Sequence, residues 1–344
     1  MNELQTILGD TVTRLFADHV STELIQKSEQ GFWPADLWRQ LEENGLTRIL
    51  VPEAQAGAGG SLSDAMIVIK AAGEHVAPVP IAETNLAAWL LSQAGLAIPA
   101  GPITVFESGD NLSVDGASNL QGRVGRVPWA RHAGHGVTVL EKDSRPHIVL
   151  APLTPARVEP DKNLALEPRD DVLFDNVAVE CAPVGQGPGN VKLFGALVRA
   201  GQMAGALQFL LDQSVTYAND RKQFGRPIGK FQAVQQELAV LATHVAAAGI
   251  VADTAARRAG RDDCWFEIAA AKIRCDEAAS RGAGIAHQVH GAIGFTYEHK
   301  LHFATRRLWS WRAEFGAGAY WAEEIGRQAM ARGADALWPY ITSR

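Results

Sequence analysis

Residues 220–235, DRKQFGRPIGKFQAVQ, gather basic and aromatic side chains in one turn between two long segments of helical apolar periodicity. Arg221, Lys222, Arg226 and Lys230 stand there beside Phe224. Arginine presents a planar fork that suits phosphate oxygens, and an aromatic face can pack on a purine. The turn therefore indicates binding of a phosphate-containing ligand, although basic side chains in a turn between helices can also be simply solvated.

Composition limits the partners of this turn. The chain has 344 residues, 47% of them hydrophobic and 20% charged, and a net charge of -6. An acidic balance argues against nucleic acid, because a surface that follows phosphates needs an excess of Lys and Arg. The three cysteines, Cys181, Cys264 and Cys275, form neither a disulfide framework nor a ligand pattern, which favours the cytoplasm. We expect no signal peptide and no membrane span.

Periodicity predicts an α+β chain of three parts. Residues 1–100 are expected to form an N-terminal helical domain, with a helix start at Pro34, an end at Gly45 and a cap at Ser61. Between these helices, the glycine-rich residues 50–61 are expected to form a flexible loop rather than a phosphate-binding loop. Residues 101–183 read as short strands and form a small middle β domain. After a linker at 181–190, residues 184–344 are expected to contain a four-helix bundle, with helices near 191–219, 231–259, 264–288 and 317–335.

The chain resembles the acyl-CoA dehydrogenases over nearly its whole length. The resemblance is carried by LWRQLEENGLTRILVPEAQAGAGGSLSDA near the start, YANDRKQFGRPIGKFQAVQQELA in the bundle and HQVHGAIGFTYEHKLHFATRRL near the end. It implies FAD as cofactor, an acyl-CoA as substrate and an electron-transfer flavoprotein as acceptor. In the family the R-x-x-F-G turn contacts FAD that a neighbouring subunit holds, and the Q-x-H-G-x-x-G turn approaches its pyrophosphate and adenosine. The cofactor-binding residues that this implies are Arg221, Gln223, Phe224, Phe231, Gln232, Gln288, Gly291 and Ala292.

Four histidines near the second turn need a separate explanation. His287, His290, His299 and His302 lie within sixteen residues of one another, a density that can indicate a metal. No Glu-x-x-His pair or cysteine joins them, so we expect no metal site.

The reaction of this family needs a base for the α proton of the thioester and a hydride acceptor, flavin N5, for the β carbon. The base should be a carboxylate whose pKa is raised by desolvation. Glu314 stands where the family usually places this residue, but Phe315 and Gly316 follow it in place of a Gly-Thr pair. Alternatively, Glu314 is a surface acid that precedes a glycine-containing turn. A minority of the family carries the base at the end of an earlier bundle helix, where this chain has Arg261, and Glu298 resembles a pocket-rim residue.

The middle domain departs from the family pattern. The usual flavin-binding segment, Thr-Glu-Pro leading to Gly-Ser-Asp, has no counterpart, and Trp129 matches the tryptophan that flanks the flavin ring in the next strand. Ala196 replaces an arginine of many straight-chain enzymes, which suggests a bulkier acyl group. Shortened chains of this kind resemble one partner of the bacterial enzymes that assemble from two unlike subunits, often acting on steroid side chains. We therefore expect an obligate homo- or hetero-oligomer with another acyl-CoA dehydrogenase-like subunit.

Three functions remain open at this point. The first is an enzyme subunit that dehydrogenates an acyl-CoA with Glu314 as the base. The second is a non-catalytic partner that completes the FAD site of another chain. The third is a flavin oxidase that uses oxygen and releases hydrogen peroxide.

Overall fold

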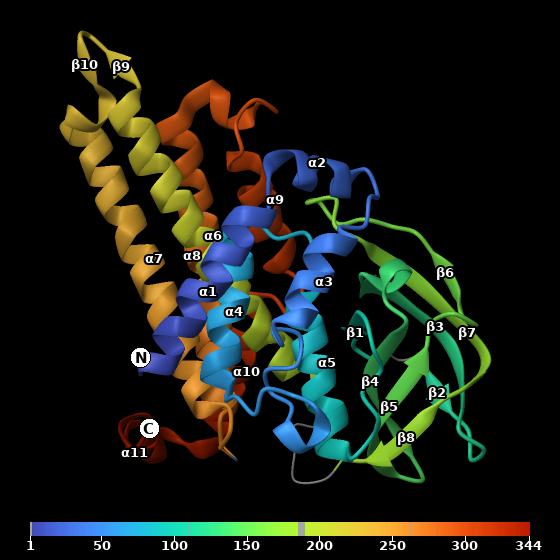
Figure 1. Cartoon of the computed structure of the whole chain (residues 1–344). Helices are drawn as coiled ribbons and strands as arrows, with labels where there is room; N and C mark the ends of the chain where they lie inside the picture. The colour runs from blue at the N-terminus through green and yellow to red at the C-terminus, as the bar shows by residue number, and fades with distance from the viewer. Residues whose placement is uncertain (1, 110, 185–189, 262) are drawn as a thin grey trace.

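The computed structural model describes residues 2–109, 111–184, 190–261 and 263–344, and helices, strands and helices follow one another along the chain (Figure 1). Residues 185–189 of the predicted linker lie outside the described residues. Ser61 caps α4 in a capping box with Asp64, and Pro34 begins α3, as the sequence predicts. The N-terminal helices are α1 (Glu3–His19), α2 (Thr22–Glu29), α3 (Ala35–Glu43), α4 (Leu62–Glu74) and α5 (Ile81–Ala94).

The glycine-rich loop before α4 folds back on itself through backbone hydrogen bonds, and its flexibility stays a prediction. The amide of Gly59 donates to the carbonyl of Val51, and that of Gly60 donates to the carbonyl of Ile49. A Cβ atom at Gly57 would lie 2.1 Å from the carbonyl oxygen of Val51. Glycine is needed here because the backbone folds back on itself.

Two four-stranded sheets form the middle of the chain, and a shared apolar core that includes Phe106, Val149 and Phe174 lies between them. One sheet has the order β1-β4-β5-β8, with β1 parallel to β4, and the other has the order β2-β3-β7-β6. Two register shifts bend β3 against β7. The strands are β1 (Ile103–Val105), β2 (Ser113–Val114), β3 (Asn119–Pro128), β4 (His135–Lys142), β5 (Arg145–Pro152), β6 (Arg157–Glu159), β7 (Arg169–Ala178) and β8 (Glu180–Pro183).

The C-terminal region is a bundle in which α8 packs against α6, α7 and α10. These four helices confirm the predicted bundle, and a short hairpin of β9 and β10 joins α6 to α7 (Figure 1). The sequence did not predict α9 or α11. The elements are α6 (Val191–Asp220), β9 (Lys222–Gln223), β10 (Arg226–Pro227), α7 (Gln232–Arg258), α8 (Trp265–His290), α9 (Leu301–Trp311), α10 (Gly318–Arg332) and α11 (Ala334–Thr342).

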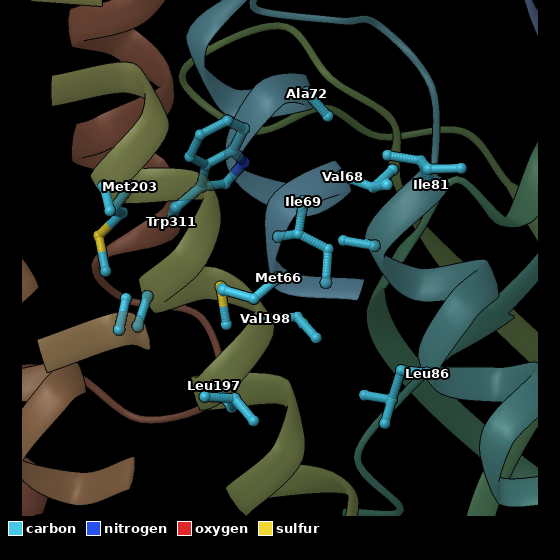
Figure 2. Close-up of a cluster of buried hydrophobic side chains, with 14 of the residues drawn as sticks. Met66, Val68, Ile69, Ala72, Ile81, Leu86, Leu197, Val198, Met203 and Trp311 are labelled. Carbon is cyan, nitrogen blue, oxygen red and sulfur yellow. The ribbon is translucent and has the colours of Figure 1, made fainter. Parts of the chain in front are cut away.

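Helix α6 also joins the bundle to the N-terminal helices. Figure 2 shows Met66 and Ile69 of α4 beside Val198 of α6 in the buried core. A Cβ atom at Gly205 of α6 would lie 1.9 Å from the carbonyl oxygen of Lys70 in α4. Glycine at this crossing therefore allows the two backbones to touch.

Helix α7 is apolar on more than its packed face. The predicted stripe is buried at Leu241, Val245 and Ala248. The helix is long and apolar enough to cross a membrane by length and composition, with only 28% of its most apolar window buried. The core helix of a bundle meets the same criterion, so the expectation of no membrane span stays a prediction.

Candidate functional site

The hairpin between α6 and α7 projects from the end of the bundle (Figure 1). Gln223 pairs with Arg226, which leaves Phe224 and Gly225 as a two-residue turn. Both turn residues have positive φ, 52° and 79°, as a type I′ hairpin requires. Left-handed backbone is costly for a phenylalanine, and the ring is 93% exposed. The fold thus holds a large apolar ring in the solvent at a site that costs backbone energy.

The same hairpin carries basic and further aromatic side chains. The guanidinium of Arg226 lies 4.3 Å from the centre of the Phe231 ring, and Phe224 meets Phe231 edge to face at 6.2 Å between centres. Arg221 and Gln223 are exposed on the same hairpin. The hairpin therefore combines aromatic faces with guanidinium donors, the combination that suits a nucleotide phosphate and base.

The second predicted turn lies at the same end of the bundle. Helix α8 ends at His290, whose ring stacks on Tyr217 of α6 with 4.5 Å between centres. Gly291 follows with φ 63° and ψ -144°, a backbone region that is open essentially to glycine alone. Gln288, Gly291 and Ala292 are exposed, as is Gln232 at the start of α7. The structure thus brings the predicted cofactor-binding residues of the two turns to one end of the molecule.

Glu314 lies elsewhere, in a pocket between the β domain and the loop after α9. This pocket has a volume of about 390 Å³, and its lining includes Phe106, Glu107, Arg126, Arg169, Glu314 and Phe315. The loop is fixed by the buried Lys272 of α8, whose Nζ donates to the carbonyls of Arg312 and Gly316, each at 2.7 Å. Burial lowers the pKa of Lys272 to about 8. This lysine holds in place the loop that carries Glu314.

Two buried arginines bind the Glu314 carboxylate. Arg169 Nε donates to Oε1 over 2.7 Å, and Arg199 Nε donates to Oε2 over 2.6 Å. Burial alone raises the pKa of Glu314, but the two guanidinium groups outweigh it and bring the pKa down to about 2. The expectation of a pKa raised by desolvation is therefore wrong for the ligand-free chain, because these arginines stabilise the charged form.

The ion pairs continue into a buried network that sequence reasoning missed. Arg199 also donates to Glu83 of α5 over 2.6 Å. Arg169 donates to Glu167, which accepts further bonds from Arg307 of α9 and from the Trp311 indole. The network ties α5, the β domain, α6 and α9 together. One signal of this network was visible in the sequence, a single charged residue within an apolar helix. These residues are Glu83 in IAETNLAAWLL and Arg199 in LFGALVRAGQMAGAL.

Trp129, which the resemblance places beside the flavin ring, is a buried residue of this chain. Its side chain is 3% exposed and packs edge to face against Trp33, with 6.4 Å between ring centres. The preceding residue, Pro128, lines the pocket instead. Trp129 has a positive φ of 57°, and this backbone turn follows the end of β3. This burial does not favour contact with a flavin ring, and the role of Trp129 stays a prediction.

The remaining candidates do not join either site. Arg261 and Glu298 are exposed, and Ala196 is fully buried in the main core. His287 stacks between Phe295 and Trp309, with 4.2 and 5.7 Å between ring centres. Within the described residues, no group of three His, Cys, Asp or Glu side chains is arranged to hold a metal ion.

The two groups of predicted site residues lie at opposite ends of α6. Arg199, which binds Glu314, lies in the third turn of this helix, and Arg221 follows its last residue. The two residues are 22 positions apart, a span of about 33 Å at the rise of an α-helix. The hairpin and the Glu314 pocket of one chain therefore lie far apart along α6.

Known proteins resemble this chain in sequence over most of its length. The chain matches the family models "Acyl-CoA dehydrogenase, N-terminal domain" over residues 2–97 and "Acyl-CoA dehydrogenase, C-terminal domain" over residues 193–332. It is 30% identical to acyl-CoA dehydrogenase IpdE2 of Mycobacterium tuberculosis, covering 89% of this chain and 91% of the relative. It is 31% identical to acyl-CoA dehydrogenase FadE34 of the same organism, covering 89% of this chain and 44% of that longer protein.

Solved structures agree on the fold. The ChsE4-ChsE5 complex from M. tuberculosis contains a chain that superposes with a TM-score of 0.87 at 23% identity, covering 97% of this chain and 99% of that one. A chain of the Tcur3481-Tcur3483 steroid ACAD G363A variant gives a TM-score of 0.86 at 24% identity, covering the same shares. The matched domains and relatives show that this chain belongs to the acyl-CoA dehydrogenase family, the FAD-dependent oxidoreductases that its motifs predicted.

Proposed function

We propose that this chain takes part in FAD-dependent α,β-dehydrogenation of an acyl-CoA thioester, at a site built from two chains. The observation that carries the proposal is the separation of the half-sites along α6. The hairpin after Arg221 and the pocket beside Arg199 lie about 33 Å apart along one helix. One bound cofactor would meet the hairpin of one chain and the pocket of another.

The residues of the hairpin fit the nucleotide half of FAD. Exposed Arg221 and Arg226 would neutralise the pyrophosphate, and Phe224 would offer its ring to the adenine. Gly291 lets the backbone of the second turn approach closely, since it carries no Cβ. The exposed Phe224 ring in a left-handed turn supports this role, because the chain itself buries almost none of it. When bound, the flavin supplies the acceptor for the β hydride.

Glu314 is the proposed acceptor of the α proton, on a condition that its ion pairs impose. With both Arg169 and Arg199 in place, a pKa of about 2 makes the carboxylate a weak base. Displacement of one guanidinium by substrate or by the second chain would raise this pKa. The proposal therefore includes a rearrangement of the network before proton transfer.

A second candidate function is favoured by the same ion pairs. A carboxylate that only stabilises the fold would also be held between two arginines, as Glu314 is. In that case the chain lends its hairpin to the FAD site of another subunit, and the base belongs to that subunit. The name of the ChsE4-ChsE5 complex shows that a protein of this fold assembles with a second one.

Replacement of Glu314 by Gln separates the two candidates. A base predicts turnover reduced by at least about a thousandfold with bound flavin retained. A structural carboxylate predicts little loss of turnover per folded chain, together with a marked loss of stability, because two buried arginines lose a charged partner. Glu107→Gln is the matched control, since Glu107 lines the same pocket but pairs with Lys192. Unchanged turnover in Glu314→Gln with flavin present would exclude Glu314 as the base.

The finer features of the reaction are also proposals. The steroid ACAD in the name of one structural neighbour supports a large, ring-bearing acyl group, whereas Ala196 is buried in the core and lends no support. Strong preference for short straight-chain thioesters over ring-bearing ones would contradict this. Electrons are proposed to pass to an electron-transfer flavoprotein, and hydrogen peroxide formed in step with product would instead indicate an oxidase. The free cysteines fit the proposed cytoplasmic location.

A further inference from the structure

We infer that Glu83 of α5 is a positioning residue for the proposed reaction, because it can bind the Arg199 guanidinium by itself and so free Glu314 to accept a proton. The inference rests on the proposed function, in which Glu314 is the base. It identifies which of the two arginines moves and which group receives it.

One edge of the Arg199 guanidinium is divided between two carboxylates. Its Nε donates to Oε2 of Glu314 over 2.6 Å, and its Nη2 donates to Oε1 of Glu83 over 2.6 Å. The Nε and Nη2 groups of an arginine form an edge that can hold a single carboxylate with two parallel hydrogen bonds. The third nitrogen, Nη1, donates to the side chain of Gln202 in the same helix. Each carboxylate of the ligand-free chain therefore receives half of a bidentate pair.

One oxygen of Glu83 lacks a donor. Its Oε2 is buried, and none of the described residues donates a hydrogen bond to it. The Glu83 side chain as a whole is 1% exposed. A buried carboxylate oxygen without a donor costs free energy, so one further hydrogen bond at this position would be favourable. Arg199 Nε is the suitable donor, because Nη2 of the same group already binds the other oxygen of Glu83.

Arg169, the second partner of Glu314, has no comparable acceptor. It also donates to Glu167 over 3.1 Å, but both oxygens of that carboxylate already have other donors. These are the side chains of Asn163, Arg307 and Trp311, at 3.0, 3.1 and 2.9 Å. A shift of Arg169 toward Glu167 would gain little, so Arg199 is the arginine that can leave Glu314.

The exchange keeps the buried charges paired. When Arg199 turns to Glu83, only Arg169 remains beside Glu314, and the pKa of Glu314 rises because its charged form loses one partner. When Glu314 then takes up a proton, it loses its negative charge, and Arg199 with Glu83 forms a complete ion pair by itself. The other charged groups around this exchange are Glu107, Arg126, Glu167, Lys272 and Arg307.

A crystal structure of the Glu314→Gln chain tests the exchange without any turnover. An amide at this position is neutral, like the protonated acid, so Arg199 should bind both oxygens of Glu83 with its Nε and Nη2. Glu29→Gln is the matched control, since Glu29 is a buried glutamate that pairs with Arg306 outside the network, and Arg199 should there stay between its two carboxylates. An Arg199 side chain that stays beside residue 314 in Glu314→Gln, with a water molecule on Oε2 of Glu83, would overturn the inference.

The pH dependence of turnover tests the effect on the base. With cyclohexylpropanoyl-CoA as a ring-bearing probe, Glu83→Gln should lower kcat about tenfold and move its acid limb down by about one pH unit, because Arg199 then stays on Glu314. Glu29→Gln should leave the acid limb in place.

A double variant shows whether Glu83 acts through Arg199. Arg199→Gln should move the acid limb upward, and adding Glu83→Gln to it should move the limb no further. A carboxylate that acted through its charge alone would lower the limb equally in both backgrounds. That result, or an unmoved limb in a folded Glu83→Gln chain, would overturn the inference.

The two accounts can fail separately. Loss of turnover in Glu314→Gln together with an unmoved acid limb in Glu83→Gln would leave the base in place and contradict only the role of Glu83. Turnover that survives in Glu314→Gln would overturn both, because the base would then lie elsewhere.

Discussion

Arg199 Nε lies 2.6 Å from Oε2 of Glu314, with the arginine fully buried and the Glu314 side chain 10% exposed. This contact links the core of α6 to the pocket that the family resemblance marks as catalytic. It also makes the proton affinity of Glu314 depend on where the guanidinium of Arg199 lies. The pKa of Glu314 and the stability of the chain therefore both depend on this one ion pair in the pocket.

Lowering the pH should destabilise the chain, because Glu314 becomes protonated. The pKa of this carboxylate falls from 4.5 to about 2 on folding, so its contribution is fully present above about pH 4.5 and is lost as the pH falls toward 2. The contribution is at most about 3 kcal/mol. Urea unfolding at pH 6 and pH 3 should show a larger loss of free energy in wild type than in Glu314→Gln. Equal acid sensitivity of the two chains would contradict the coupling.

Replacement of Arg199 should weaken the fold and strengthen the base. Arg199→Gln leaves Glu83 without its buried cationic partner and Glu314 with only one of its two, at a cost of about 3–5 kcal/mol. The pKa of Glu314 should rise, because Arg169 alone remains beside it, and the acid limb of kcat against pH should move upward. Arg126→Gln, in the same pocket but exposed, should change stability by less than about 0.5 kcal/mol. An unmoved acid limb in a folded, active Arg199→Gln chain would argue against Glu314 as the base.

The hairpin ring should matter for cofactor and not for folding. Phe224 is 93% exposed, so Phe224→Ala should leave the free energy of unfolding within about 0.5 kcal/mol of wild type. FAD affinity should fall about tenfold, a loss of about 1.4 kcal/mol in binding. Trp338→Ala, which removes a 73% exposed ring on α11, should change neither quantity. Fluorescence titration with FAD and urea unfolding measure both, and equal FAD affinity in the two variants would contradict the role of Phe224.

The crossing of α4 and α6 should not tolerate a methyl group. Gly205→Ala would place Cβ 1.9 Å from the Lys70 carbonyl oxygen, so the helices must move apart at a cost of about 1–3 kcal/mol. Gly284→Ala, in α8 with open space around it, should instead stabilise by up to about 1 kcal/mol. Thermal unfolding of the two variants compares them directly. A Gly205→Ala chain as stable as Gly284→Ala would show that the crossing is looser than described.

Local chemistry explains what the sequence could predict. The bundle helices followed from apolar residues at helical spacing, and Ser61 was recognisable as a cap because its partner Asp64 lies three residues away. The hairpin was recognisable because Gly225 and its basic neighbours are contiguous. Each of these features is determined by residues within one or two turns of chain.

Long-range contacts explain what the sequence could not predict. The partners of Glu314 come from β7 and α6, 145 and 115 residues earlier in the chain, so nothing near Glu314 predicted its lowered pKa. Trp129 matched a family position, but its burial against Trp33 depends on how a helical segment meets the β domain. The domain boundaries at 100/101 and 183/184 remain predictions, because the second lies beside residues 185–189.

The most direct test of a shared site is the dependence of flavin binding on chain concentration. The purified FAD-bound protein would be diluted through the range in which sedimentation shows dissociation, while the fluorescence of released FAD is followed. A site built from two chains predicts that FAD leaves in step with dissociation and returns on concentration. FAD that stays bound to the separated chains, one per monomer, would contradict the shared site.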